Sequence, residues 1–177
     1  MAGRVSVVQA TIATVTTAKT LAQGTAGTNT PFSIEYLAVD GQSDTADAME
    51  ILIQRITTGG TLTAYTERGW DPGGGAATAA WATNATVEPT YTADTELFRR
   101  SVSTQAGGGL QVTFPVGELI VRGAALIGIK SNITVTSTTL TFTIVYREWA
   151  YGPALYCTSR RPGRACADRL RGGREGV

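Results

Sequence analysis

The run Leu140-Thr141-Phe142-Thr143-Ile144-Val145-Tyr146 alternates apolar and polar side chains for most of its length. Successive side chains of a β-strand point to opposite faces, so this period of two predicts a strand with one buried face. Phe32 to Tyr36 alternates in the same way and precedes Asp40-Gly41, a turn dipeptide. Met49 to Ile56 is more continuously apolar, which predicts a strand buried on both faces.

Further short apolar runs lie between clusters of turn residues along the rest of the chain. They are Val5 to Val15, Leu62 to Tyr65, Leu97 to Val102, Leu110 to Phe114, Leu119 to Val121 and Leu126 to Ile129. About eight strands at roughly ten-residue spacing are typical of a β-sandwich or a barrel. The 29 threonines and 21 glycines agree with a β-rich chain. A single helical turn is expected over Ser43 to Met49, where Asp44 could cap it.

Composition divides the chain into three parts. Residues 1–18 form an N-terminal arm or a first strand, because Ser6 and Gln9 interrupt what would otherwise be the apolar core of a signal peptide. Residues 19–150 form one mildly acidic β domain. Residues 151–177 form a basic tail with six arginines, two acidic residues and no apolar periodicity.

The absence of histidine excludes several classes of function. A chain of 177 residues without histidine has no Ser-His-Asp or Cys-His catalysis and no histidine-containing zinc site. Cys157 and Cys166 are too few for a zinc site, and two free thiols are favoured over a disulfide between them. No apolar stretch approaches the roughly 18 residues that a membrane-spanning helix needs. No membrane partner is therefore expected.

Acidic residues suggest no catalytic or metal site. Asp40, Asp44 and Asp47 lack the spacing of a calcium-binding loop and are interpreted as turn and cap residues. Catalysis by two carboxylates would need a converging pair, and nothing in the spacing selects one. The possible partners are Glu35, Glu50, Glu96, Glu118 and Glu148. We therefore expect no catalytic, metal-binding or cofactor-binding residue, no cofactor and no enzymatic activity.

Two other features suggest an interaction surface. Trp70 and Trp81 flank a Gly/Ala-rich loop, and each either anchors a partner or packs back onto the domain. The tail arginines, among them Arg160, Arg161, Arg164 and Arg169, could contact an acidic protein surface. Nucleic acid is a weaker alternative, because only Tyr156 lies near them to stack on bases. A solubilising tail without a specific role is the third possibility.

The order of several turn and strand motifs resembles a known group of proteins. The motifs are Lys19-Thr20-Leu21-Ala22-Gln23, Pro31, Val39-Asp40-Gly41, Ile51 to Arg55, Thr57-Thr58-Gly59-Gly60-Thr61-Leu62-Thr63, Val87-Glu88-Pro89-Thr90, Phe114-Pro115-Val116-Gly117, Leu126-Ile127-Gly128-Ile129 and Tyr146-Arg147-Glu148. Over about residues 19 to 148 this order resembles small all-β head-associated proteins of tailed bacteriophages and prophages, some of which look like capsid decoration (cement) proteins. The bare loop at 73–80 and the extension over 149–177 depart from that pattern.

The resemblance implies a single jelly-roll-like β-sandwich with an extended N-terminal arm and a basic C-terminal tail. It implies a protein made in the host cytoplasm that binds the outer surface of the assembled head, bridges major capsid protein subunits and stabilises the shell by mass action. Closed symmetry at a capsid axis favours a homotrimer. The segment Ala2 to Thr16, with Arg4, Val5 and Val7, would add as a strand to a capsid edge, so its deletion would abolish binding and leave the body folded. The tail would bind acidic patches and release at high salt.

Two other classes of function remain open. A carbohydrate- or receptor-binding module of the phage tail or baseplate would use Trp70, Trp81 and Trp149 to stack on sugar rings. A two-carboxylate enzyme is the third hypothesis.

Overall fold

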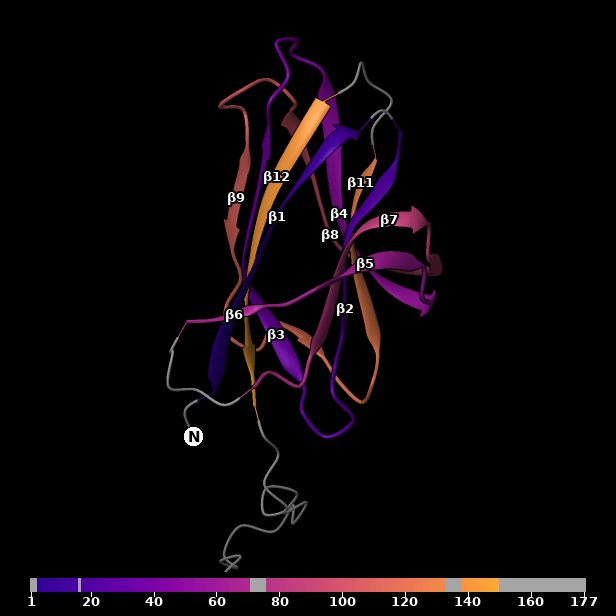
Figure 1. Cartoon of the computed structure of the whole chain (residues 1–177), viewed down its shortest axis with the longest axis vertical. Helices are drawn as coiled ribbons and strands as arrows, with labels where there is room; N and C mark the ends of the chain where they lie inside the picture. The colour runs from indigo at the N-terminus through magenta and orange to yellow at the C-terminus, as the bar shows by residue number, and fades with distance from the viewer. Residues whose placement is uncertain (1–2, 16, 71–75, 133–137, 150–177) are drawn as a thin grey trace, which may run out of the picture.

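The computed structural model describes residues 3–15, 17–70, 76–132 and 138–149. Their regular structure is entirely β and forms two antiparallel sheets of six strands each (Figure 1). This confirms the all-β prediction, with twelve strands in these ranges where the sequence indicated about eight. Among the described residues, none lies in a helix with the length and apolarity needed to cross a bilayer.

The first sheet contains the first and last strands of the described residues. Its members are β1 (Arg4–Val15), β3 (Phe32–Gly41), β6 (Arg68–Gly69), β9 (Leu110–Thr113), β10 (Leu119–Val121) and β12 (Thr138–Glu148). The order is β10-β3-β12-β1-β6, and β9 also pairs with β3. Strands from the two ends of the sequence therefore lie side by side in the middle of this sheet.

The second sheet has the same arrangement, because the second strand of the chain lies beside the second-to-last one. It contains β2 (Lys19–Thr25), β4 (Ala48–Thr58), β5 (Thr61–Tyr65), β7 (Ala80–Val87), β8 (Thr90–Ser103) and β11 (Leu126–Asn132). The order is β5-β7-β2-β11-β4-β8. The chain alternates between the two sheets from β1 to β4 and again from β11 to β12, which gives most contacts a large sequence separation.

Strand β12 supplies the centre of the core. Its residues alternate between buried and half-buried along the whole strand, and Leu140, Phe142, Ile144 and Tyr146 are almost inaccessible to solvent. These side chains belong to one apolar cluster with members of both sheets. Strand β4 is buried on both faces over much of Met49 to Ile56, as its sequence predicted.

The N-terminal segment is an integral strand of the first sheet. Strand β1 pairs with β12 from Arg4 to Ile12 and again at Val15, on either side of a register irregularity. Its inward residues Val8, Ile12 and Val15 are buried in the core. Of the two expectations for residues 1–18, the first strand therefore holds for Arg4–Val15, and the free arm does not, because the apolar face of this segment is buried in the core. We therefore expect that deleting Ala2 to Thr16 would unfold the body, contrary to the expectation from the resemblance.

The expected helical turn over Ser43 to Met49 is also absent. Ser43 forms a bridge with Gln105, and the Asp47 amide donates to Thr104 Oγ1 at 3.2 Å. Thr104 Oγ1 in turn donates to the Thr45 carbonyl at 3.0 Å. These tertiary bonds satisfy backbone groups that a short helix would have paired locally, so the segment runs without a helical turn into β4.

Candidate interaction surface

Strand pairing brings three of the predicted interface residues together. Strand β6 pairs with β1 through Ser6 opposite Gly69 and Val7 opposite Arg68. The Trp70 amide then donates to the Val5 carbonyl at 2.9 Å. One further step of the same antiparallel register places Trp70 opposite Val5. Residues that are far apart in the sequence thus share one edge of the first sheet.

These residues continue an apolar row across the outer face of the first sheet. Val7 pairs with Val145 of β12, and Val145 pairs with Tyr36 of β3. Directly opposite residues on adjacent strands have side chains on the same face. Val5, Val7, Val145 and Tyr36 are all half-buried, so part of each remains open to solvent. We call Val5, Val7, Arg68, Trp70 and Val145 the Trp70 surface.

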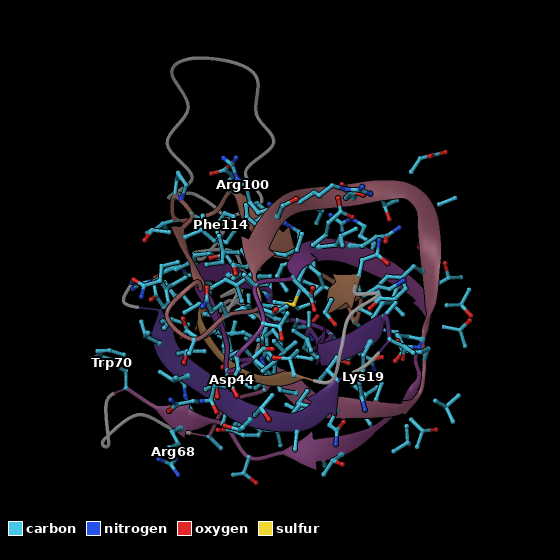
Figure 2. The ribbon with its side chains drawn as sticks, turned by 90° about the horizontal axis from the view of Figure 1, so that it is seen from above. Lys19, Asp44, Arg68, Trp70, Arg100 and Phe114 are labelled. Atoms are coloured by element: carbon cyan, nitrogen blue, oxygen red, sulfur yellow. The ribbon has the colours of Figure 1, made fainter. Side chains whose placement is uncertain are left out.

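Trp70 is the most exposed large apolar side chain among the described residues, with 69% of its area open to solvent. Figure 2 shows Trp70 and Arg68 at the periphery of the molecule, directed away from the core. The hydrogen bond from the Trp70 amide to the Val5 carbonyl fixes the backbone of Trp70 beside β1. A large ring presented on an ordered backbone loses little entropy on binding, and Trp is enriched at interface hot spots.

Trp81 has the opposite environment and is not available as an interface residue. Only 3% of its area is exposed, and its ring lies 5.4 Å from Phe32 and 5.3 Å from Tyr146 between centroids. Strand pairing places it opposite Gly24, where an added Cβ would lie 2.8 Å from the indole ring. The structure thus corrects the expectation for Trp81: it packs back into the core because a glycine leaves room for it.

Arg4 also departs from the expected surface. Its Nε donates to Ser6 Oγ at 3.0 Å, and Ser6 is completely buried, so the guanidinium turns toward the inner face of β1. It lies near the phenol of Tyr146, where burial raises the pKa of the tyrosine and the negative charge of Glu67 raises it further. Arg4 is therefore part of a polar cluster at the end of the core, on the face opposite Val5 and Val7.

Glu148 fixes the segment that leads into Trp81. Its buried carboxylate accepts hydrogen bonds from the Thr78 amide and hydroxyl, both at 3.0 Å, and from the Ala79 amide at 2.5 Å. The end of β12 is thereby joined to the start of β7. Three charge-assisted bonds at one carboxylate oxygen make Glu148 a structural residue.

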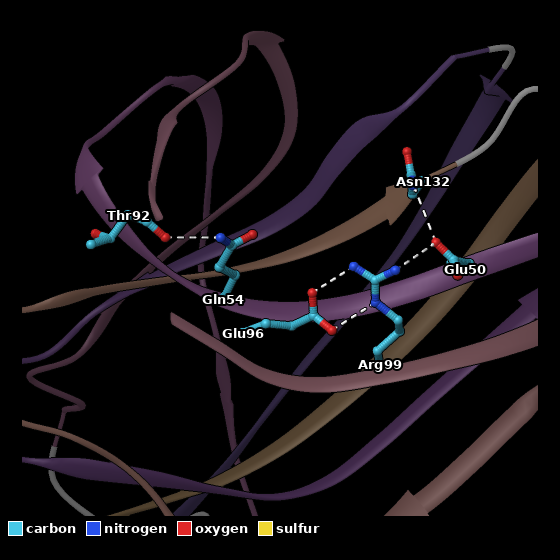
Figure 3. A network of polar contacts seen from close by, with 6 residues as sticks. All are labelled: Glu50, Gln54, Thr92, Glu96, Arg99 and Asn132. Atoms are coloured by element: carbon cyan, nitrogen blue, oxygen red, sulfur yellow. Dashed lines mark hydrogen bonds and ion pairs between the residues drawn. The ribbon is translucent and has the colours of Figure 1, made fainter. Parts of the chain in front are cut away.

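The other glutamates with ionic contacts pair with arginines. Arg147 Nε lies 2.5 Å from Glu35 Oε1. Arg99 lies 2.6 Å from Glu96 and 3.5 Å from Glu50, on an exposed face (Figure 3). The hydrogen bonds from Arg99 lower the pKa of the Glu96 carboxyl, which is opposite to what a general acid requires.

The same polar network joins three strands of the second sheet. Asn132 Nδ2 of β11 donates to Glu50 Oε2 of β4 at 3.2 Å, and Gln54 Nε2 donates to the Thr92 carbonyl of β8 at 2.9 Å (Figure 3). The bond between Gln54 and Thr92 lies beside the register shifts between β4 and β8. The arrangement of the two bonds is that of cross-strand supports, and no three acidic, cysteine or histidine residues in the described ranges are grouped to hold a metal ion.

Sequence reasoning missed Arg68 and Val145. Val145 carried a signal, because it is apolar at a position where the alternation of β12 otherwise places Thr141 and Thr143. Arg68 carried none, since its place depends on the pairing of a two-residue strand with β1. The tail candidates Arg160, Arg161, Arg164 and Arg169, together with Cys157 and Cys166, lie outside the described residues.

Comparison with protein-family models, with curated proteins and with solved structures finds no match to this protein.

Proposed function

We propose that this protein is a bacteriophage capsid decoration (cement) protein that binds the outer surface of the assembled head. The observation that carries the proposal is the Trp70 surface, in which an exposed indole lies beside Val5, Val7 and Val145 on an ordered sheet. A protein that acts by bridging subunits needs such a surface and needs no acid, base or metal. The proposal of a phage protein rests on the order of sequence motifs over about residues 19–148, which resembles that of phage head-associated proteins.

We also infer a jelly-roll topology within the two sheets. If β5, β6, β7 and β10 are set aside as additions, the remaining orders are β9-β3-β12-β1 and β2-β11-β4-β8. Numbered along the sequence, these eight strands read 6-3-8-1 and 2-7-4-5, which is the arrangement of a jelly roll. Jelly rolls occur in viral capsid proteins and in lectins, so the topology supports a virion role and leaves a sugar-binding role open.

The mechanism of stabilisation would be mass action. A ligand that binds the assembled shell and not its separated subunits lowers the free energy of the shell by an amount set by its concentration relative to Kd. Burial of Trp70 against the major capsid protein would provide a hot spot of about 2 kcal/mol or more. A homotrimer at a local symmetry axis would present three such surfaces and gain avidity from their linkage.

The test is binding to emptied, expanded phage heads, measured by co-sedimentation and by the heat resistance of the shell. We expect saturable binding at a fixed number of copies per capsid. Trp70→Ala should weaken binding at least about 30-fold if Trp70 is a hot spot. Val87→Ala is the matched control, because Val87 is 60% exposed and lies on β7 of the other sheet. Absence of binding to heads, or equal losses in both variants, would overturn the proposal.

A carbohydrate- or receptor-binding module of the phage tail is the second candidate, and the exposed ring of Trp70 favours it too. An exposed indole beside a polar group, here Arg68, is the usual element of a sugar-stacking site. The burial of Trp81 removes it from the set of possible stacking residues. Quenching of Trp fluorescence by host glycans, lost in Trp70→Ala, would favour this function over the capsid role.

A further inference from the structure

A second potential binding site lies away from the Trp70 surface, where the two sheets meet at the edge strand β10. It is an open pocket of about 390 Å³ lined by Arg55, Gly117, Glu118, Ile120 and Arg122. Arg55 comes from β4 of the second sheet, whereas Ile120 lies on β10 of the first. The pocket therefore opens at the rim of the core between the sheets.

Arg55 occupies a core-facing position of its strand. It follows Met49, Ile51 and Ile53 at the same period of two, and all three of these are buried in the core. It also pairs directly with Ile127 of β11, which is fully buried. An arginine that continues a row of buried apolar residues is partly desolvated, and such a charge usually has a partner. Within the described residues, Arg55 makes neither an ion pair nor a side-chain hydrogen bond.

A second guanidinium and one carboxylate complete the lining. Arg122 is exposed and follows β10 directly, next to Gly123 and Ala124, whose φ values are +60° and +58°. Glu118 directly precedes β10, at the opposite end of the strand from Arg122. Neither Arg55 nor Arg122 forms an ion pair with Glu118 at 4.0 Å or less. Two guanidiniums and one carboxylate leave the pocket with a single excess positive charge.

We propose that this pocket binds one carboxylate group presented by another molecule. Arginine matches a carboxylate through two parallel hydrogen bonds, and the partial burial of Arg55 strengthens them. A monoanion neutralises the pocket, whereas a dianionic phosphate would exceed its charge and meet repulsion from Glu118. Ile120 provides an apolar contact for the carbon that bears the carboxylate.

The site can be tested by NMR on the arginine side chains of the intact protein. Sodium acetate is titrated at constant ionic strength while the Nε–Hε signals are followed, with inorganic phosphate as the second probe. We expect saturable shifts at Arg55 and Arg122 with acetate and weaker binding of phosphate. Arg100 is the internal control, because it is exposed on β8 and outside the pocket. The proposal would be overturned if the signals of Arg55 and Arg122 shifted without saturation and by the same amount as the signal of Arg100.

Three variants sharpen the test, and their thermal unfolding is measured to confirm that each is folded. Arg122→Ala should weaken acetate binding by about tenfold or more, while Arg100→Ala leaves it unchanged. Glu118→Gln should tighten acetate binding and allow phosphate to bind as well, since the repelling charge is removed. An unchanged preference in Glu118→Gln would refute the charge argument.

The source of the carboxylate is distinguished by two model compounds. N-acetylglutamate α-amide represents a glutamate side chain of a protein, and N-acetylglycine represents the carboxyl terminus of a polypeptide. Tighter binding of either than of acetate would assign the pocket to that feature of a protein partner, and equal binding would assign it to free carboxylic acids. Failure of all three compounds to bind would exclude the site without affecting the proposed role of Trp70.

Discussion

Replacement of Trp81 by alanine should test the central packing of this fold. The indole is only 3% exposed, its centroid lies 5.4 Å from that of Phe32 and 5.3 Å from that of Tyr146, and it is opposite Gly24. Trp-to-Ala substitutions in cores cost about 3–5 kcal/mol, because transfer energy is lost and a cavity remains. A loss of this size is a large part of the total stability of a domain, which is about 5–15 kcal/mol. Each kcal/mol lowers the Tm of a domain of this size by about 2–4 °C, so the expected decrease in Tm is roughly 6–20 °C.

Urea denaturation followed by far-UV circular dichroism at about 25 °C measures this loss without relying on tryptophan fluorescence. Trp70→Ala is the matched control, and its free energy of unfolding should change by no more than about 0.5 kcal/mol because the side chain is 69% exposed. A loss below about 1 kcal/mol for Trp81→Ala would refute the packing described here. So would equal losses in the two variants.

The contact with Gly24 provides a second arm of the same experiment. A Cβ at this position would lie 2.8–3.0 Å from three atoms of the Trp81 ring, so Gly24→Ala should cost about 1–3 kcal/mol by overpacking. In the Trp81→Ala background that cost should largely vanish, because the ring that causes the clash is gone. Additive effects of the two substitutions would show that the residues are not in contact.

Three further results are expected. Burial raises the pKa of Tyr91 to about 12, so the stabilisation that the neutral phenol provides is complete below the ordinary pKa of 10.0 and is lost as the pH rises from there to about 12. Absorbance at about 295 nm should show this late titration of Tyr91, and the signal should be missing in Tyr91→Phe. Glu148→Ala should lower the free energy of unfolding by about 2–5 kcal/mol, since two amides that it binds lose their acceptor, whereas Glu50→Ala on the exposed face should cost less than about 1 kcal/mol. A protein lacking residues 1–16 should fail to give a cooperative unfolding transition, because β1 lies between β12 and β6; a folded truncated protein would contradict the role of β1 in the core.

The sequence predicted the strands where a local pattern was strong. The alternation from Leu140 to Tyr146 identified the inward residues of β12, and the apolar run from Met49 to Ile56 identified a strand buried on both faces. It did not predict the outcome for Ser43 to Met49, because the hydrogen bonds to Thr104 that prevent a helical turn come from a distant part of the sequence. Short local signals are overridden wherever tertiary partners satisfy the backbone.

What the sequence by itself determined is the class of the protein: an all-β domain without histidine chemistry, whose period-two runs mark their own buried faces. Only the tertiary structure decided which tryptophan is exposed, since Trp70 and Trp81 flank the same loop and look alike in sequence. Trp81 is buried because it pairs with Gly24, whereas Trp70 is exposed because it follows β6, the edge strand that pairs with β1. The approach of Arg55 and Arg122 likewise depends on how the two sheets meet at β10. Strand geometry is local and can be read from neighbouring residues, whereas sheet order and register join distant residues.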